Sequence, residues 1–134
     1  MGGFVRPLVA VATMAALLTA AGVVRVSAQD EWKAPPDAKQ MKNPEKGTEL
    51  GQKSVETNCV PCHGPGGKGD GPAAAALTPK PANWTSDKVK KETDGELFWK
   101  LSNGRGPMPP WKHLPEKERW QIVNYIRVLQ KQGK

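Results

Sequence analysis

The sequence is poor in residues that fill a large core and rich in residues that interrupt regular structure. Its 134 residues include two Phe, one Tyr and two Cys, against 14 Gly and 13 Pro. The one long apolar run lies within residues 8–24, and no segment repeats or alternates like a strand. A short chain with a single apolar run excludes a multidomain enzyme, a repeat array and a polytopic membrane protein.

The first 28 residues contain no Asp or Glu, and they combine Arg6 with the apolar run and small residues at 26–28. This pattern predicts a secretory signal peptide over residues 1–28. An uncleaved membrane anchor is the alternative, because residues 8–24 approach the length of a bilayer span and Arg25 flanks them. Both interpretations place the domain outside the cytoplasm. We expect the periplasm, with a tether to the inner membrane if the anchor is kept.

Few apolar side chains remain beyond residue 28. The apolar fraction of the whole chain is 37%, and much of it lies in the N-terminal run. A small domain with so few apolar side chains is close to its stability limit. The composition therefore indicates that a cofactor fills part of the interior.

Two N-terminal segments can be distinguished after residue 28. Residues 29–43 are polar and interrupted by prolines, and they predict a loosely ordered tail. Asn43 and Pro44 are residue types favoured at the start of a helix. The helix predicted there has a face of small residues, which indicates that another backbone crosses close by. This face comprises Gly47, Leu50, Gly51, Ser54 and Val55.

Two further helices are predicted near the C-terminus. Thr93 and Glu96 have the spacing of a capping box, and Gly104 ends the apolar stretch that follows. Pro115 opens the last helix, whose apolar face would cross the face of small residues. Residues 44–132 thus predict an all-α domain with long irregular connections. The apolar face comprises Ile122, Tyr125, Ile126 and Leu129.

Cys59, Cys62 and His63 form the sequence C-x-x-C-H, which is the attachment signature of a c-type haem. Two thiols three residues apart at a helix end can each bond one of two adjacent vinyl groups, and the next side chain directs its imidazole at the iron. We therefore expect one covalently bound haem c, attached through both cysteines and ligated by His63. Such a haem would also fill the thin core.

Three other interpretations of these residues are open. Cys59 and Cys62 could form a redox disulfide, although such motifs belong to a βαβ setting and no strand is visible here. A zinc site could use both cysteines with His63 and His113, although the adjacent Cys62 and His63 are awkward around one tetrahedral centre. A structural disulfide would close a loop of only two residues and remove little chain entropy.

Met108 is the expected second axial ligand. It lies between Pro107 and Pro109 in a stiff loop, an odd place for a methionine that only packs. Thioether ligation raises the potential of a haem and suits electron transfer. His113 is the rival ligand and would give bis-histidine ligation, whereas Met41 lies in the tail and is less suited.

The surroundings of the haem are less specific in the sequence. The second ring nitrogen of His63 needs an acceptor, and the carbonyls of Pro72 and Pro79 are candidates. Lys80 and Arg105 could pair with haem propionates, although a surface position is the commoner fate of such residues. Large indoles could wall the porphyrin or simply form core. These indoles belong to Trp84, Trp99, Trp111 and Trp120.

The chain resembles the class I c-type cytochromes, specifically the small bacterial members grouped with the haem subunits of cbb3-type oxidases. The resemblance covers residues 44–132 and rests on Gly51, the C-x-x-C-H-G motif, and the segments GKGDGPAA, GPMPPW and WQIVNYI. It implies a cytochrome c fold of three to five helices around one haem, with the first and last helices crossing near Gly51 and Tyr125. It also points to Met108 as a ligand. Val55 departs from the family, which usually has Phe or Tyr there.

A haem with both axial positions filled by protein can pass single electrons and has no open site for a substrate. The expected function is therefore electron transport between redox partners by a monomer that is not an enzyme. Without residues 1–28, which include Arg6 and Arg25 and no acidic residue, the net charge falls from +7 to +5. This positive charge could steer the chain toward acidic partners, although lysines spread through a chain also suit a solvated surface. No basic cluster indicates nucleic-acid binding. The alternatives are a haem subunit fixed in a larger membrane oxidoreductase and, with an open iron position, a peroxidase-like enzyme.

Overall fold

A computed structural model describes residues 1–3 and 31–133. The chain divides into two compact units, Met1–Glu31 and Trp32–Lys134, and all described helices belong to the second. The signal peptide or anchor predicted over residues 1–28 lies almost wholly outside the described residues. None of the helices in the described ranges is long and apolar enough to cross a membrane.

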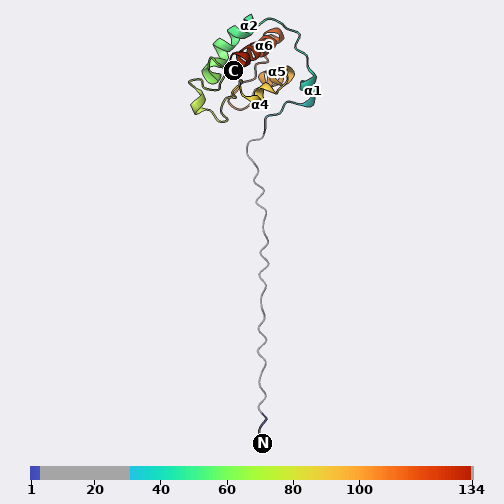
Figure 1. The fold of residues 1–134 in the computed structure, drawn as a ribbon, viewed down its shortest axis with the longest axis vertical. Helices are drawn as coiled ribbons and strands as arrows, with labels where there is room; N and C mark the ends of the chain where they lie inside the picture. Colours follow the sequence, from blue (N-terminus) through green and yellow to red (C-terminus); the bar gives the residue numbers. More distant parts are fainter. Residues whose placement is uncertain (4–30, 134) are drawn as a thin grey trace. The chain divides into compact units, whose positions relative to one another are not determined.

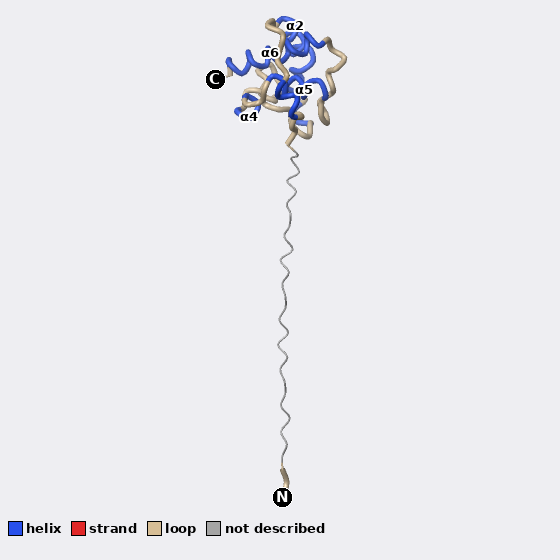
Figure 2. The backbone as a smooth tube through the Cα atoms, turned by 90° about the vertical axis from the view of Figure 1, so that its right-hand side faces the viewer, coloured by secondary structure: helices blue, strands red, loops and turns tan. Residues whose placement is uncertain are grey.

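The unit Trp32–Lys134 is all-α (Figures 1 and 2). Its elements are α1 (Pro36–Gln40), α2 (Glu49–Ser54), the π-helix η1 (Val55–Cys59), α3 (Val60–His63), the 3-10 turn η2 (Ala74–Ala76), α4 (Asp87–Lys90), α5 (Asp94–Asn103) and α6 (Glu116–Gln132). Residues 49–63 form one continuous helix, so the described residues contain five helices and one 3-10 turn. They contain no strand, only an isolated bridge between Arg105 and Met108. The predicted all-α fold is confirmed.

The helix that carries the cysteine motif crosses α6 (Figure 1), and Gly51 lies at the crossing. Gly51 lies so close to the main chain of Gln121 and Ile122 that a Cβ atom would overlap them. The Leu50 N–H donates to Gln121 Oε1 at 3.0 Å across the same crossing. The predicted crossing of these helices is confirmed, and its closest point lies one turn before Tyr125.

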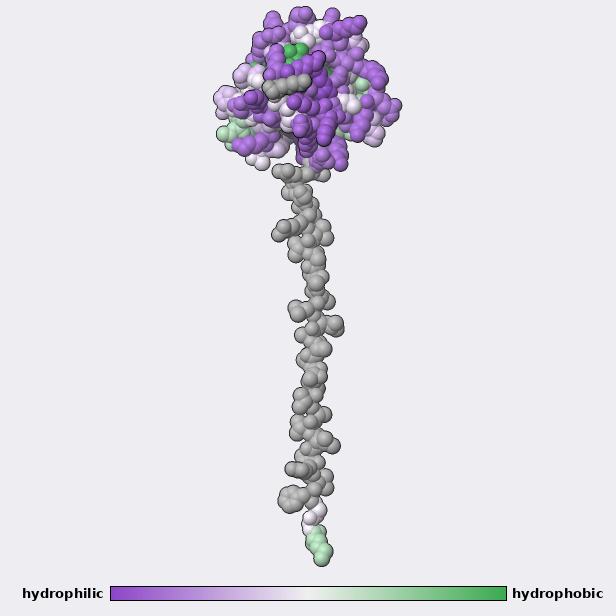
Figure 3. Space-filling view, viewed as in Figure 1, coloured by the Kyte–Doolittle hydropathy of each residue, from purple (hydrophilic) through white to green (hydrophobic). Residues whose placement is uncertain are grey.

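Helix α5 begins with the capping box that the sequence predicts. Thr93 Oγ1 accepts from the Glu96 N–H at 3.2 Å, and Glu96 Oε2 accepts from the Thr93 N–H at 2.8 Å. The helix ends before Gly104, whose φ of 65° favours glycine. Phe98 of α5 stacks on Trp120 of α6, with ring centroids 3.9 Å apart, inside the core. Figure 3 shows that the visible face of the described domain is mostly hydrophilic.

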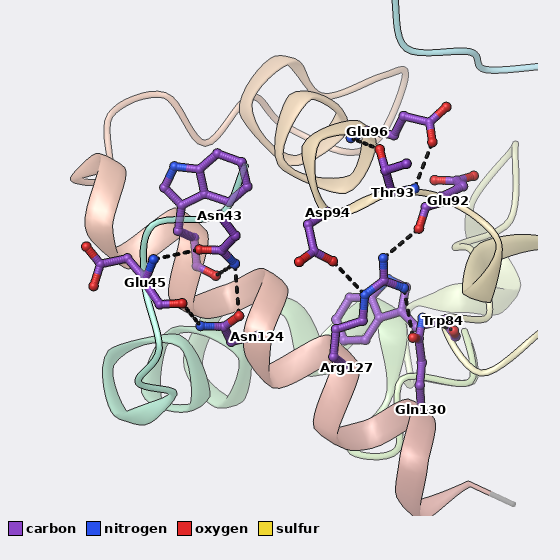
Figure 4. A network of polar contacts seen from close by, with 11 residues as sticks. Asn43, Glu45, Trp84, Glu92, Thr93, Asp94, Glu96, Asn124, Arg127 and Gln130 are labelled. Carbon is purple, nitrogen blue, oxygen red and sulfur yellow. Dashed lines mark hydrogen bonds and ion pairs between the residues drawn. The ribbon is translucent and has the colours of Figure 1, made fainter. Parts of the chain in front are cut away.

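The predicted helix start at residue 44 is wrong, because α2 begins at Glu49. Asn43 does not cap this helix. Its Nδ2 donates to Asn124 Oδ1 at 2.9 Å, and its Oδ1 accepts from the Glu45 N–H at 2.9 Å (Figure 4). Asn124 Nδ2 donates in turn to the carbonyls of Glu45 at 2.9 Å and Gly47 at 3.0 Å. These bonds to α6 hold the segment as a loop and replace the first helical turn.

Part of the predicted loose tail is ordered on α5. Helix α1 buries Ala38, and Gly95 of α5 lies so close to the Ala38 carbonyl that a Cβ atom would overlap it. The Trp32 ring centroid lies 5.5 Å from Lys100 Nζ and 6.0 Å from Arg105 Cζ. Contacts between segments so far apart in the sequence leave no local sequence pattern. For this reason the sequence predicts a loosely ordered tail over residues 29–43.

Candidate functional site

The cysteine motif ends the continuous helix over residues 49–63. Cys59 closes the π-helix η1, and Cys62 and His63 lie in α3. Cys59 and His63 are buried, Cys62 is half-buried, and both cysteines are free thiols. Gly64 follows with a φ of 74° and turns the chain away directly after His63. The two thiols and the imidazole therefore lie together at one helix end, as the sequence predicts.

The glycine-rich loop after the motif folds back over the end of α3. The Gly69 N–H donates to the His63 carbonyl at 2.8 Å, and the Gly71 N–H donates to the Cys62 carbonyl at 3.1 Å. Gly71 also lies so close to the Pro61 main chain that a Cβ atom would overlap it. These bonds satisfy carbonyls at the helix end and fix the loop around the motif.

His63 has one ring nitrogen held and one left with a lone pair. Its Nδ1 lies 3.1 Å from the Ala82 carbonyl oxygen. Burial lowers the pKa of His63 below its ordinary value, and the hydrogen bond to Ala82 opposes that shift. The ring therefore carries one proton at neutral pH, and this proton lies on Nδ1 because a carbonyl can only accept. Nε2 therefore carries no proton, and its lone pair can bind a metal ion.

The predicted acceptors for His63 are wrong. The carbonyl that bonds Nδ1 belongs to Ala82, not to Pro72 or Pro79. The connection after the motif is long, and it is the later part of it, next to Trp84, that lies against the ring. A backbone carbonyl has no residue signature, so spacing alone did not identify the position.

The Cys59 thiol is unsuited to thiolate chemistry. Burial raises its pKa to about 12, and the neighbouring Cys62 adds to this shift. Reactive cysteines of disulfide oxidoreductases have lowered pKa values, because the thiolate is the nucleophile. Cys59 stays protonated at neutral pH, which disfavours the redox-disulfide interpretation.

The zinc interpretation fails on geometry. Among residues 1–3 and 31–133, no three His, Cys, Asp or Glu side chains are grouped as a metal ion would need. His113 is exposed, and its nearest aromatic ring is that of Trp111, at a centroid distance of 5.4 Å. The proposed set of Cys59, Cys62, His63 and His113 therefore does not form a ligand cluster.

Met108 lies in a short loop that main-chain bonds close. The Arg105 N–H donates to the Met108 carbonyl at 2.9 Å, and the Met108 N–H donates to the Arg105 carbonyl at 3.0 Å. Gly104 and Gly106, with φ of 65° and 54°, flank Arg105 and make the turn possible. The Met108 side chain is half-buried. It packs against the same cluster of buried residues that includes Cys59.

The other residues predicted to contact the haem have different surroundings in the structure. Lys80 is exposed, with its Nζ 3.5 Å from the Ala75 carbonyl. Arg105 lies against the Trp32 ring. Among the indoles, that of Trp84 stacks on His63. Trp120 stacks instead on Phe98, and Trp99 and Trp111 are half-buried.

The donor set fits a covalently attached haem. Cys59 and Cys62 are free to form thioether bonds, and a neutral His63 with its proton on Nδ1 presents Nε2 to an iron. No other group of described residues offers a comparable set.

Comparisons with known proteins agree with this chemistry. Residues 44–126 match the family described as cytochrome C oxidase, cbb3-type, subunit III. Among solved structures, a chain of the Kuenenia stuttgartiensis reducing HAO-like protein complex is similar, with a TM-score of 0.57 and 29% identity over 66% of this chain and 45% of that chain. This chain therefore spans less than half the length of that relative. No curated protein matches. The family match covers more than half of the sequence, so the chain belongs to the cbb3-type cytochrome c oxidase subunit III family and is a class I c-type cytochrome domain.

Proposed function

We propose that the chain is an exported mono-haem c-type cytochrome that carries single electrons between redox protein partners. Cys59 and Cys62 would hold the haem through thioether bonds, and His63 and Met108 would be its axial ligands. The haem supplies a one-electron couple when bound. The observation that carries the proposal is the buried His63 imidazole, whose Nδ1 is held by the Ala82 carbonyl, at the same helix end as two free thiols.

Each of these residues has a defined part in electron transfer. The Ala82 carbonyl holds the Nδ1 proton of His63 and so strengthens donation from Nε2. The Met108 thioether would raise the potential of the haem, and the main-chain bonds to Arg105 hold the Met108 backbone in place. With His63 and Met108 as its ligands, the iron would have no position left for a substrate. We therefore propose a carrier and not an enzyme.

The proposed partners are proteins with acidic docking surfaces. The sequence carries a net charge of +7, and the visible face of the unit Trp32–Lys134 is mostly hydrophilic (Figure 3). Opposite charge on a partner would speed encounter without a large permanent interface. The proposed carrier is a monomer. We place it in the periplasm, because c-type haem attachment takes place outside the cytoplasm. The predicted signal peptide supports that location.

Absorption spectra of the periplasmic fraction test the proposal. We expect a haem c α-band after dithionite reduction, a matching pyridine haemochrome, and a weak far-red band of sulfur-to-iron ligation in the oxidised form. A fraction containing the chain without haem c would overturn the proposal. Haem c without the far-red band would remove Met108 as the ligand and leave the Cys59, Cys62 and His63 assignments standing.

A second candidate function is an electron-transfer subunit fixed in a larger membrane oxidoreductase. It is favoured by the family, which is described as an oxidase subunit, and by the relative, which belongs to a complex. Covalent haem survives denaturing electrophoresis, so haem staining can follow the chain through native fractionation. A haem-stained chain that runs with a large detergent-solubilised complex would favour the subunit, and one that runs alone in the periplasmic fraction would favour the carrier.

A further inference from the structure

His63 is contacted twice by one short segment, residues 82–84. The Ala82 carbonyl accepts from Nδ1, and the Trp84 ring stacks on the imidazole with centroids 4.4 Å apart and 22° between the planes. Trp84 is 7% exposed, so this stack is inside the protein. A hydrogen bond fixes one ring atom, whereas a stacked ring restricts the plane. Together the two contacts determine the orientation of the imidazole.

Trp84 is itself held on three sides. Its N–H donates to the Gly67 carbonyl at 2.7 Å, and its carbonyl accepts from Gln130 Nε2 at 2.9 Å. Gly67 has a φ of 69° and lies so close to the indole that a Cβ atom would overlap it. The indole therefore has little freedom to move away from His63.

Gln130 is an unusual anchor, because a neutral polar side chain of α6 is 6% exposed. Both polar atoms of its amide are bonded: Arg127 Nη1 donates to Gln130 Oε1 at 2.9 Å, while Gln130 Nε2 donates to the Trp84 carbonyl (Figure 4). Arg127 is fixed in turn by Asp94 Oδ1 at 2.8 Å and by the Glu92 carbonyl. This chain of bonds ties the end of α6 to the residue that stacks on the motif histidine.

We propose that Trp84 is a positioning residue for His63 and that Gln130 holds it there. The inference rests on the proposed function, in which His63 is an iron ligand. The hydrogen bond to Ala82 alone lets the imidazole pivot, and the indole face prevents this rotation. The electron-rich face also favours an imidazole with more positive charge, which is its condition on ferric iron. Loss of the indole should therefore rotate the ring and raise the midpoint potential.

The test uses the full-length exported protein with its haem. Potentiometry gives the midpoint potential, and electron paramagnetic resonance of the ferric form gives g-values that depend on the orientation of the axial imidazole. We expect Trp84→Leu to change the g-values and shift the potential upward. Trp84→Phe keeps an aromatic face and should stay close to the wild type. Gln130→Ala keeps the indole but loosens it, so its shifts should be smaller and in the same direction.

A matched control separates positioning from general loss of packing. Trp120 is buried like Trp84, with 2% of its surface exposed, but it stacks on Phe98 and not on His63. Trp120→Leu should lower thermal stability and leave the g-values and the potential unchanged. Equal shifts in Trp120→Leu and Trp84→Leu would overturn the inference, because they would reflect packing alone.

The remaining outcomes also decide the inference. Wild-type g-values and potential in Trp84→Leu would overturn it. If Trp84→Leu does not fold, Gln130→Ala decides: shifted values support the inference and unshifted values overturn it. If the wild type has a normal haem c spectrum and the variants keep its g-values and midpoint potential, only this inference is overturned. A wild-type chain without haem c would remove the proposed function and the inference with it.

Discussion

At the scale of single residues, Met108 is the part of the site most open to test. Met108→Ala should abolish the far-red band, leave an iron that accepts added ligands such as cyanide, and raise peroxidase activity, because one axial position is then open. His113→Ala is the matched control, since His113 is exposed, and its spectrum should equal that of the wild type. A far-red band that persists in Met108→Ala would show that another residue supplies the sulfur.

Glu96 links stability to pH through the capping box of α5. Burial raises the pKa of Glu96, but bonds from Thr93 and the charges of Lys39 and Lys100 outweigh it, so the pKa lies below its usual value. A carboxyl with a lowered folded-state pKa stabilises the protein above its unfolded pKa of about 4.3, and this contribution is lost as pH falls through the folded value.

Glu96→Gln should therefore lower the free energy of unfolding by roughly 1 kcal/mol at pH 7 and by little at acid pH, where the carboxyl of the wild type is protonated. Urea unfolding of the haem-loaded protein at several pH values measures this difference. Exposed Glu49→Gln, placed in the first turn of α2, provides a comparison. A loss that is constant across pH would contradict the assigned ionisation.

Residues whose side chains carry the chemistry could be predicted from the sequence, and residues that act through the backbone could not. Cys59, Cys62 and His63 were recognisable because thiols and an imidazole at that spacing suit one cofactor. The acceptor for His63 was misassigned because any residue has a carbonyl. Trp84 was identified only as one of several indoles, since the stack on His63 depends on the course of a long loop.

At the scale of elements, the crossing of α2 and α6 depends on the absence of a side chain at Gly51. Gly51→Ala would place a methyl group inside the Gln121 main chain and force the helices apart. We expect a loss of about 1–3 kcal/mol in the free energy of unfolding, as for overpacked cores. Gly66→Ala is the control, because a Cβ atom at Gly66 would lie 3.9 Å from the nearest atoms, which belong to the Lys68 side chain. Equal stability of the two variants in urea would refute the close crossing.

The ordered part of the tail supports the loop that carries Met108. Trp32 lies beside Arg105, and Arg105 bonds the Met108 main chain in both directions. Trp32→Ala should cost about 1–2 kcal/mol of stability, from lost aromatic burial and cation–π attraction, and should speed displacement of Met108 by imidazole. Trp32→Phe should restore most of both. Stopped-flow mixing with imidazole measures the rate, and an unchanged rate in Trp32→Ala would separate the tail from the ligand loop.

The elements differ in how far local sequence determined them. The capping box of α5 and the apolar face of α6 are local patterns, and both appear in the structure as predicted. Helix α1 and the late start of α2 depend on distant partners, Gly95 for one and Asn124 for the other. Local patterns therefore located the helices and gave no sign of these tertiary contacts.

At the scale of the whole unit Trp32–Lys134, helix α6 connects the parts of the site. It crosses the motif helix at Gly51, its Asn124 holds the loop before that helix, and its Gln130 holds the residue that stacks on His63. The start of the motif helix and the ring at its end are thus fixed to one rigid element. Such a frame would suit the proposed electron transfer, because it would keep His63 in position while the charge of a bound iron changes.

The positive charge of the chain predicts how its electron-transfer rate responds to salt. An anionic oxidant such as ferricyanide should react more slowly as ionic strength rises from about 10 mM to about 150 mM, because the Debye length falls from roughly 30 Å to about 8 Å. A cationic oxidant such as cobalt hexaammine should react faster over the same range, since repulsion by the net charge is screened. Stopped-flow oxidation of the reduced protein measures both rates. The two rates should change in opposite directions, whereas a general effect of salt on the fold would change both in the same direction. Rates that change in the same direction would therefore contradict the prediction and remove the support for an acidic partner surface.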